Sequence, residues 1–166
     1  GHANARVEGI FEKPTFRDAA RQRRCLVPVD GYYEWKTEGR LKIPYYFRAA
    51  DGGPLAFAGL WSLQVVPGCP PRRSLCLLTV APNREAGEVH SRMPVLLPPD
   101  RRNDWLSERA LDPEAFAAFA VTAPDRSLSM QRVSVDVNRV SIDAPHLVEP
   151  LHGATDQPDF LGDLLG

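Results

Sequence analysis

Proline is the residue that most constrains this chain, because sixteen of its 166 residues are proline. A proline ends an α-helix and removes a hydrogen-bond donor from a strand, so it is found mainly at helix starts, sheet edges and connections. Most of the prolines here stand at the boundaries of apolar segments. The chain is therefore divided into short segments, and each can be assigned to a helix or a strand.

Three helices are expected from their starting residues. Thr15 as N-cap and Asp18 three residues later form a capping-box-like start for a helix over residues 15–24. Asp100 is expected to cap a second helix. Asp112 opens the third, because it is followed by a proline at the first helical position and an acid in the first turn.

Strands are expected where apolar and aromatic residues are continuous or alternate. An aromatic-rich pair flanks a glycine-containing turn, which predicts a hairpin. An unbroken apolar run before Ala81 predicts a fully buried strand. The expected strands cover residues 25–29, 32–36, 42–48, 55–65, 74–80, 95–97 and 128–133.

The order of these segments predicts an α+β fold. We expect a single domain over residues 1–150 with a mixed, largely antiparallel sheet, bifurcated or barrel-like and flanked by helices. Residues 151–166 are expected to form a C-terminal tail. The trailing segment after Asp143 is punctuated by proline and glycine, so we expect it to be loosely ordered.

Charge and cysteine usage exclude several classes of protein. The net charge is −1, so no global basic field attracts nucleic acid, and anion binding must come from local clusters. Three cysteines without CxxC spacing indicate reduced thiols and no zinc site. No apolar run reaches about 18 residues. We therefore expect a cytoplasmic protein with no membrane contact, no metal and no cofactor.

The string Gly31-Tyr32-Tyr33-Glu34-Trp35 contains a carboxylate within a strand. Alternation places Glu34 on the face opposite Tyr33 and Trp35. Glutamate is disfavoured in strands, so Glu34 in a cleft would suit proton transfer. The alternative is a solvated carboxylate on the outer face of the hairpin.

The string His90-Ser91-Arg92-Met93-Pro94 offers an imidazole and a guanidinium two residues apart. In an extended segment both side chains project in the same direction. His90 is then a candidate general base, and the alternative is a surface histidine in a loop.

The string Asn4-Ala5-Arg6-Val7-Glu8 places Asn4 and Arg6 on one face of an extended segment. The planar fork of Arg6 suits a phosphate, and Asn4 can both donate and accept hydrogen bonds. The alternative is an ordinary strand with exposed polar residues. The arginines from Arg17 to Arg24 form either a phosphate-binding face or a solvated helix surface.

Taken in order, these strings closely resemble the SRAP family (SOS response-associated peptidase). The resemblance runs from Asn4 to about Pro150. It is supported by further segments, which are Arg23-Arg24-Cys25-Leu26-Val27-Pro28, Gly59-Leu60-Trp61, residues 78–83, Val137-Asn138 and residues 147–150.

The resemblance implies a sensor of abasic sites in single-stranded DNA. Family members are expected to remove their initiator methionine autocatalytically, in a peptidase-like step. The amino-terminal cysteine that remains then cross-links to the ring-opened sugar aldehyde, closing a thiazolidine ring, and the family is also expected to have lyase activity. The protein would be cytoplasmic, and associated with the nucleoid when bound to DNA.

The resemblance also implies roles for individual residues. Asn4 would hold the reacting terminus and the sugar, and Glu34 would transfer protons during Schiff-base and ring formation. His90 would bind and protonate the opened sugar. The DNA-binding residues would be Arg6, Arg92 and Trp35.

One feature departs from the family pattern, which begins Met-Cys-Gly-Arg and has several strands before the Asn-Ala-Arg string. Here that string starts at Asn4. The chain is therefore expected to be the larger, C-terminal part of the domain, able to bind DNA but not to cross-link to it. An exposed sheet edge and apolar patch would make it poorly stable or self-associating.

Two functions of different classes remain open. The first is an abasic-site processing enzyme or its truncated form. The second is a noncatalytic module that binds single-stranded DNA. A metal-dependent hydrolase built on Glu34 and His90 has no evident third ligand.

Overall fold

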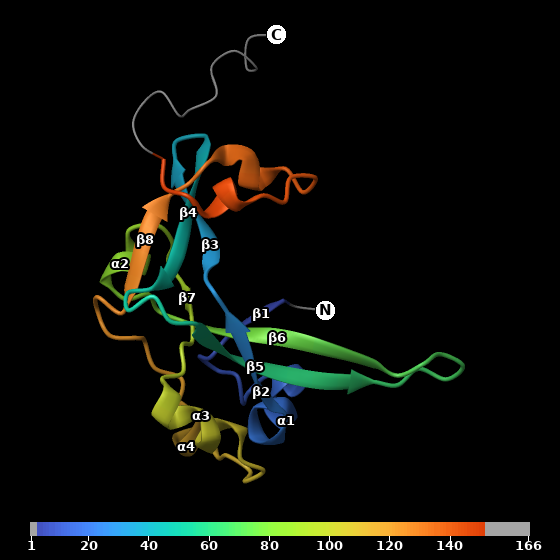
Figure 1. Ribbon diagram of the computed structural model, residues 1–166. Coiled ribbons are helices and arrows are strands. Elements are labelled where there is room, and N and C mark those ends of the chain that lie inside the picture. The colour runs from blue at the N-terminus through green and yellow to red at the C-terminus, as the bar shows by residue number, and fades with distance from the viewer. Residues whose placement is uncertain (1–2, 152–166) are drawn as a thin grey trace.

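The computed structural model describes residues 3–151 (Figure 1). The tail predicted over residues 151–166 lies outside the described residues except for Leu151. In the described part of the chain the strands form two sheets. The first sheet has the order β1-β6-β5-β2, with β7 also paired to β6. These strands are β1 (Asn4–Arg6), β2 (Arg24–Val29), β5 (Leu55–Gln64), β6 (Arg72–Val80) and β7 (Met93–Pro94).

The second sheet has the order β3-β4-β8, formed by β3 (Tyr32–Glu38), β4 (Leu41–Ala49) and β8 (Leu128–Arg132). Only β1 and β6 pair in parallel among the described strands, and the other pairs are antiparallel. The predicted α+β fold with a mixed, largely antiparallel sheet is confirmed. Neither sheet closes, which favours the bifurcated arrangement over the barrel-like one.

Strand β6 uses both of its edges. Leu77 lies between Asn4 of β1 and Gly59 of β5. Two residues further on, Thr79 lies opposite Arg6 on one edge and opposite Pro94 of β7 on the other. The Asn4 string and the His90 string, which are far apart in the sequence, therefore meet at one end of β6.

The predicted hairpin is confirmed as β3 and β4, with a turn at Gly39, whose φ is +60°. The Tyr33 and Trp35 ring centroids lie 6.5 Å apart, so these side chains share one face of β3 and Glu34 faces the other way, as predicted. Gly31 leads from the first sheet into β3. A Cβ there would lie 2.4 Å from the Phe47 carbonyl oxygen, so the chain can only pass this point as glycine.

Helices and short 3₁₀ turns connect and cover the strands. They are α1 (Pro14–Gln22), α2 (Arg84–Gly87), α3 (Pro99–Leu106), α4 (Pro113–Ala117), η1 (Val135–Asn138) and η2 (Pro145–Val148). The cap predicted for α4 is confirmed, because the Ala115 amide donates a 2.8 Å hydrogen bond to Asp112 Oδ1.

Two other predicted caps are wrong for one reason. A proline at the first helical position starts each helix a residue or more earlier than expected. Lys13 is therefore the N-cap of α1, in place of Thr15, and Pro98 is the N-cap of α3, in place of Asp100.

Two predictions about burial also need correction. Strand β6 alternates between buried and partly exposed residues, because only one face packs on the core, and Leu75 is 47% exposed. The described residues after Asp143, up to Leu151, pack against the rest of the fold, and the Leu151 amide donates a 3.0 Å hydrogen bond to the Arg132 carbonyl. The turn η2 buries Leu147, whose carbonyl accepts a hydrogen bond from the Tyr33 hydroxyl at 3.3 Å.

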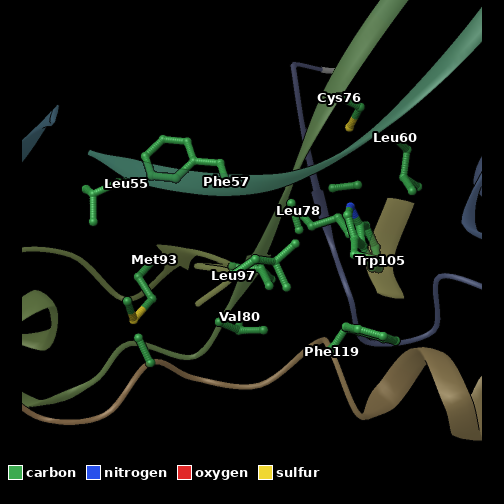
Figure 2. Packing of buried hydrophobic residues seen from close by; sticks show 14 of the residues in the cluster. Leu55, Phe57, Leu60, Cys76, Leu78, Val80, Met93, Leu97, Trp105 and Phe119 are labelled. Atoms are coloured by element: carbon green, nitrogen blue, oxygen red, sulfur yellow. The ribbon is translucent and has the colours of Figure 1, made fainter. Parts of the chain in front are cut away.

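The core lies between the first sheet and the helices α3 and α4. Figure 2 shows Trp105 close to Leu78, with Phe119 also facing this region. The Trp105 ring packs against Phe116 and Phe119 at centroid distances of 5.7 and 5.5 Å. Its Nε1 donates to the Cys25 carbonyl at 2.9 Å, which fastens α3 to the edge strand β2.

Arg24 is a buried structural residue, with 7% of its surface exposed. Its guanidinium donates hydrogen bonds to the carbonyls of Trp105 (2.8 Å), Ser107 (2.6 Å), Arg109 (2.9 Å) and Arg21. The side chain thus joins the end of α1 to the end of α3. The predicted arginine face over residues 17–24 does not include it, because Arg24 already belongs to β2.

We predict that Arg24→Met destabilises the protein by about 3 kcal/mol, because buried carbonyls lose a charged donor and keep none in its place. Chemical denaturation measures the loss. Arg17→Met, on the exposed side of α1, is the control and should stay within about 0.5 kcal/mol of wild type. Equal stability of the two variants would contradict the structural role of Arg24.

The β5–β6 hairpin extends away from the rest of the molecule (Figure 1) and carries exposed apolar residues. They are Leu63, Val65, Val66 and Leu75, with 50%, 66%, 45% and 47% of their surfaces exposed. A contiguous apolar surface of this kind favours association. Self-association of the chain stays a prediction, and this hairpin is where we expect it.

We predict that the double variant Leu63→Lys, Leu75→Lys shifts the chain toward monomer in sedimentation velocity at micromolar concentration. Leu106→Lys is the control, because this residue is equally exposed (49%) but lies on α3. A wild-type chain that is monomeric over the whole concentration range would rule out association through the hairpin.

Candidate functional site

A cavity of about 390 Å³ lies where the two sheets meet. Its walls come from β1, β3, β5, β6, β7 and the residues just before β7. The lining residues are Asn4, Arg6, Tyr32, Tyr33, Glu34, Phe57, Leu77, Thr79, His90, Arg92, Met93 and Pro94. Three sequence strings that lie far apart in the chain therefore contribute to one site.

Most of the predicted site residues meet in this cavity: Asn4, Arg6, Glu34, His90 and Arg92 all line it. Trp35 does not. It lies on the other face of β3, where its Nε1 donates a 2.8 Å hydrogen bond to Asn138 Oδ1. Strand alternation places the Trp35 side chain on the face of β3 opposite Glu34.

Glu34 and His90 face one another, with 3.9 Å between His90 Nδ1 and Glu34 Oε1. The Glu34 side chain is 29% exposed and that of His90 44% exposed. The geometry therefore decides against the alternatives of a carboxylate on the outer face of the hairpin and an isolated loop histidine. A carboxylate and an imidazole at this distance can exchange protons with a substrate bound beside them.

The position of His90 is fixed by the short helix α2. Asn83 caps this helix, because its Oδ1 accepts a 3.0 Å hydrogen bond from the Ala86 amide. The Ala86 carbonyl then accepts the His90 amide at 2.9 Å. His90 Nδ1 lies 3.2 Å from the Arg92 amide nitrogen and 3.1 Å from the Arg92 carbonyl oxygen. The segment is thus a tight turn, although the sequence suggested an extended one.

Strand β1 presents Asn4 and Arg6 on one face, as predicted. The residue between them, Ala5, is buried with 5% exposure, while Asn4 and Arg6 are both exposed. Pairing with β6 holds this short strand in place. The exposed guanidinium of Arg6 can reach an anion at the cavity mouth.

The Arg92 side chain is fixed by contacts with other residues of the protein. It is 17% exposed and forms a two-pronged ion pair with Glu8, with distances of 2.7 and 2.8 Å to the carboxylate oxygens. It also donates to the Thr79 carbonyl. The hydrogen bonds from Arg92 hold the pKa of the Glu8 carboxyl below its usual value, and the charge of Arg6 adds to this.

Glu8 and Thr79 were missed as site residues by the sequence reasoning. The signal for Glu8 was present, because it ends the same string as Asn4 and Arg6. Its partner Arg92 is 84 residues away in the sequence, and no local pattern indicates that the two side chains meet.

Tyr32 is another lining residue that the sequence reasoning missed. Its ring stacks on Phe47 with centroids 5.0 Å apart and meets the Phe57 ring edge-on at 5.5 Å. Its hydroxyl is buried and has no hydrogen-bond partner in the described part of the chain. Burial raises the pKa of Tyr32, and the charge of Glu34 raises it further, so the hydroxyl remains a neutral donor.

The cysteines all lie outside the cavity lining. Cys76 is buried and Cys25 half-buried, and burial raises the pKa of both thiols, while Cys69 is exposed. Over residues 3–151, no group of histidine, cysteine, aspartate or glutamate is arranged to hold a metal ion. None of the helices in that range has the length and apolar character needed to cross a membrane.

Comparison with known proteins agrees with the motifs. Residues 1–140 match the model of the family described as SOS response associated peptidase (SRAP). The chain belongs to the SRAP family. The resemblance drawn from the strings at Asn4, Gly31 and His90 is thereby confirmed.

Similar proteins come from several organisms. The abasic site processing protein YoqW of Bacillus subtilis is 32% identical over 147 residues, which cover 88% of this chain and 66% of that protein. YedK of Escherichia coli, with the same description, is 28% identical over 149 residues, covering 89% and 67%. A crystal structure of a protein from Bacteroides thetaiotaomicron has a TM-score of 0.84 and 27% identity, covering 90% of this chain and 66% of the other. The chain spans about two thirds of the length of these SRAP relatives.

Proposed function

We propose that this SRAP chain processes abasic sites in DNA, with the damaged sugar bound in the cavity beside Glu34 and His90. The observation that carries the proposal is the meeting of this pair with Arg6 in one cavity. The names of its relatives, which are abasic site processing proteins, support it independently.

Binding can be assigned to residues on the cavity wall. An abasic site keeps its two flanking phosphates and loses its base, so it presents a sugar small enough for a cavity of about 390 Å³. Arg6 would bind one phosphate, and Asn4 would donate to or accept from the sugar oxygens. Single-stranded DNA is the proposed form, since a free strand can bring its sugar into a recessed site. Trp35, outside the cavity, would contact a neighbouring base by stacking.

Proton transfer can be assigned to Glu34 and His90. When an amine condenses with the ring-opened aldehyde, the nitrogen loses one proton, and the carbonyl oxygen gains two and leaves as water. Glu34 would carry the proton from the nitrogen to the oxygen, and His90 would donate the second, which leaves a protonated Schiff base. The thiol on the same residue as the amine would then return its proton to His90 and attack the imine carbon, which closes the thiazolidine ring. The same acid and base would serve the lyase step that the family resemblance implies.

The cross-link needs an amine and a thiol on one residue, and the lining residues supply neither group. The proposal for this chain is therefore substrate binding and proton transfer. No metal or cofactor takes part, and the proposed location is the cytoplasm, on the nucleoid when DNA is bound.

We predict that Arg6→Gln weakens binding of abasic single-stranded DNA about fivefold and lowers the slope of log Kd against log salt by about one, because one phosphate contact is lost. Fluorescence anisotropy at several salt concentrations measures both. Arg40→Gln, in the exposed turn of the β3–β4 hairpin, is the control and should bind like wild type. No binding by wild type would sink the proposal, and equal binding of intact and abasic strands would favour a noncatalytic single-strand-binding module.

We predict that the chain accelerates the reaction of free L-cysteine with an abasic aldehyde, because L-cysteine brings the missing amine and thiol together. Glu34→Gln should slow this reaction about a hundredfold, at the low end of the range for general acid–base catalysis, while leaving DNA affinity unchanged. Mass spectrometry of the oligonucleotide measures the thiazolidine formed. Glu38→Gln, at the exposed end of the same strand, is the control. Equal rates with and without the chain would contradict proton transfer by this site.

A further inference from the structure

The ion pair between Glu8 and Arg92 joins two parts of the site that are distant in the sequence. Glu8 lies just beyond β1, and Arg92 lies two residues beyond His90. The carboxylate binds both terminal nitrogens of the guanidinium, at 2.7 and 2.8 Å. A two-pronged pair of this kind fixes orientation as well as distance. The carbonyl of Thr79 takes a further hydrogen bond, so Arg92 is also fastened to the central strand β6.

The backbone of Arg92 contacts the His90 ring directly. Its amide nitrogen lies 3.2 Å from His90 Nδ1, and its carbonyl oxygen lies 3.1 Å from the same atom. A ring without a hydrogen on Nδ1 accepts the Arg92 amide hydrogen there, and a ring with a hydrogen on Nδ1 donates it to the Arg92 carbonyl. The Glu34 carboxylate lies 3.9 Å from the same Nδ1 atom. In each protonation state Nδ1 is held by these neighbours, and Nε2 is the ring nitrogen left for a substrate.

We propose that Glu8 is a positioning residue for His90. By holding the Arg92 side chain, Glu8 keeps the 90–92 turn in the geometry in which the Arg92 backbone contacts His90 Nδ1, and so sets the orientation and tautomer balance of the ring. Glu8 itself is 58% exposed and is absent from the residues that line the cavity, so it acts through Arg92. The effect on catalysis rests on the proposed function, whereas the effect on the ring does not.

The alternative role for Glu8 is that of a phosphate substitute, whose carboxylate occupies the place where a DNA phosphate would bind Arg92. The contacts favour the positioning role. The Arg92 side chain is 17% exposed and is also bound to β6, whereas the neighbouring Arg6 is exposed and faces the cavity. A phosphate would meet Arg6 first. When Glu8 is neutralised, the positioning role predicts an unchanged DNA affinity, whereas the phosphate-substitute role predicts tighter binding.

The test compares Glu8→Gln with Glu12→Gln in the 166-residue chain. Glu12 is an exposed carboxylate in the turn that follows Glu8, so it controls for the loss of one negative charge. Nitrogen-15 NMR of histidine-labelled protein, at a pH where the rings are neutral, identifies the His90 tautomer, and His90→Asn assigns its signals. We expect the same His90 tautomer balance in wild type and Glu12→Gln, and a different balance in Glu8→Gln.

A second measurement separates positioning from a general loss of structure. Far-UV circular dichroism and the unfolding transition show whether Glu8→Gln is folded. If Glu8→Gln is unfolded, Glu8→Asp takes its place, because it keeps the charge but has a shorter side chain. In the L-cysteine reaction we expect Glu8→Gln to be about tenfold slower at saturating DNA, since small misplacements of a catalytic group are costly, with an unchanged Kd.

Three results would overturn the proposal. An unchanged His90 tautomer balance in folded Glu8→Gln would show that the turn keeps its geometry without Glu8. An equal change in Glu12→Gln would assign the effect to net charge. Tighter DNA binding by Glu8→Gln would favour the role as a phosphate substitute. The NMR result stands even where the chain shows no reaction with abasic DNA, so the two proposals can fail separately.

Discussion

Hydrogen bonding on both edges of β6 is the constraint on which the rest of this structure depends. One edge pairs with β5 over residues 72–77 and with β7 at residues 79–80, and the other edge pairs in parallel with β1. Strand β1 is only three residues long, so it keeps its place because a longer strand supplies its partners. The Asn4 and His90 strings reach the same cavity because both border Thr79.

The third string, from Gly31 to Trp35, reaches the cavity because the chain changes sheets at its start. The chain passes from β2 in the first sheet to β3 in the second at Gly31, where no side chain would fit against Phe47. From that point, alternation turns Glu34 toward His90 and places Trp35 on the opposite face of β3, while Tyr32 and Tyr33 both border the cavity. A change of sheet next to a rigid hairpin thus aims the carboxylate at His90.

The arginines divide into structural and accessible groups according to what surrounds them. Arg24 is buried among the carbonyls at two helix ends, and Arg92 is bound by Glu8 and Thr79. Arg6 is exposed at the cavity. A guanidinium is costly to bury without partners, so the protein surrounds its buried arginines with acceptors and leaves an exposed one for a ligand.

The sequence alone determined the local features of this SRAP domain. The hairpin, the cap at Asp112, the outward turn of Trp35 relative to Glu34 and the shared face of Asn4 and Arg6 all follow from interactions within a few residues. The family, too, was evident from short motifs in a fixed order. Where local rules failed, as at Thr15 and Asp100, a neighbouring proline displaced the helix start by another local effect.

Only the tertiary structure decided which of these features meet. Glu34 approaches His90 to 3.9 Å, and Glu8 binds Arg92, although the members of each pair are more than 50 residues apart in the sequence. Arg24, which is close in sequence to the arginines of α1, is instead buried against the end of α3. Such contacts depend on which strands pair with β6 and on where the chain changes sheets. Local propensity carries no information about either, because the free energy of strand pairing comes from partners that are remote along the chain.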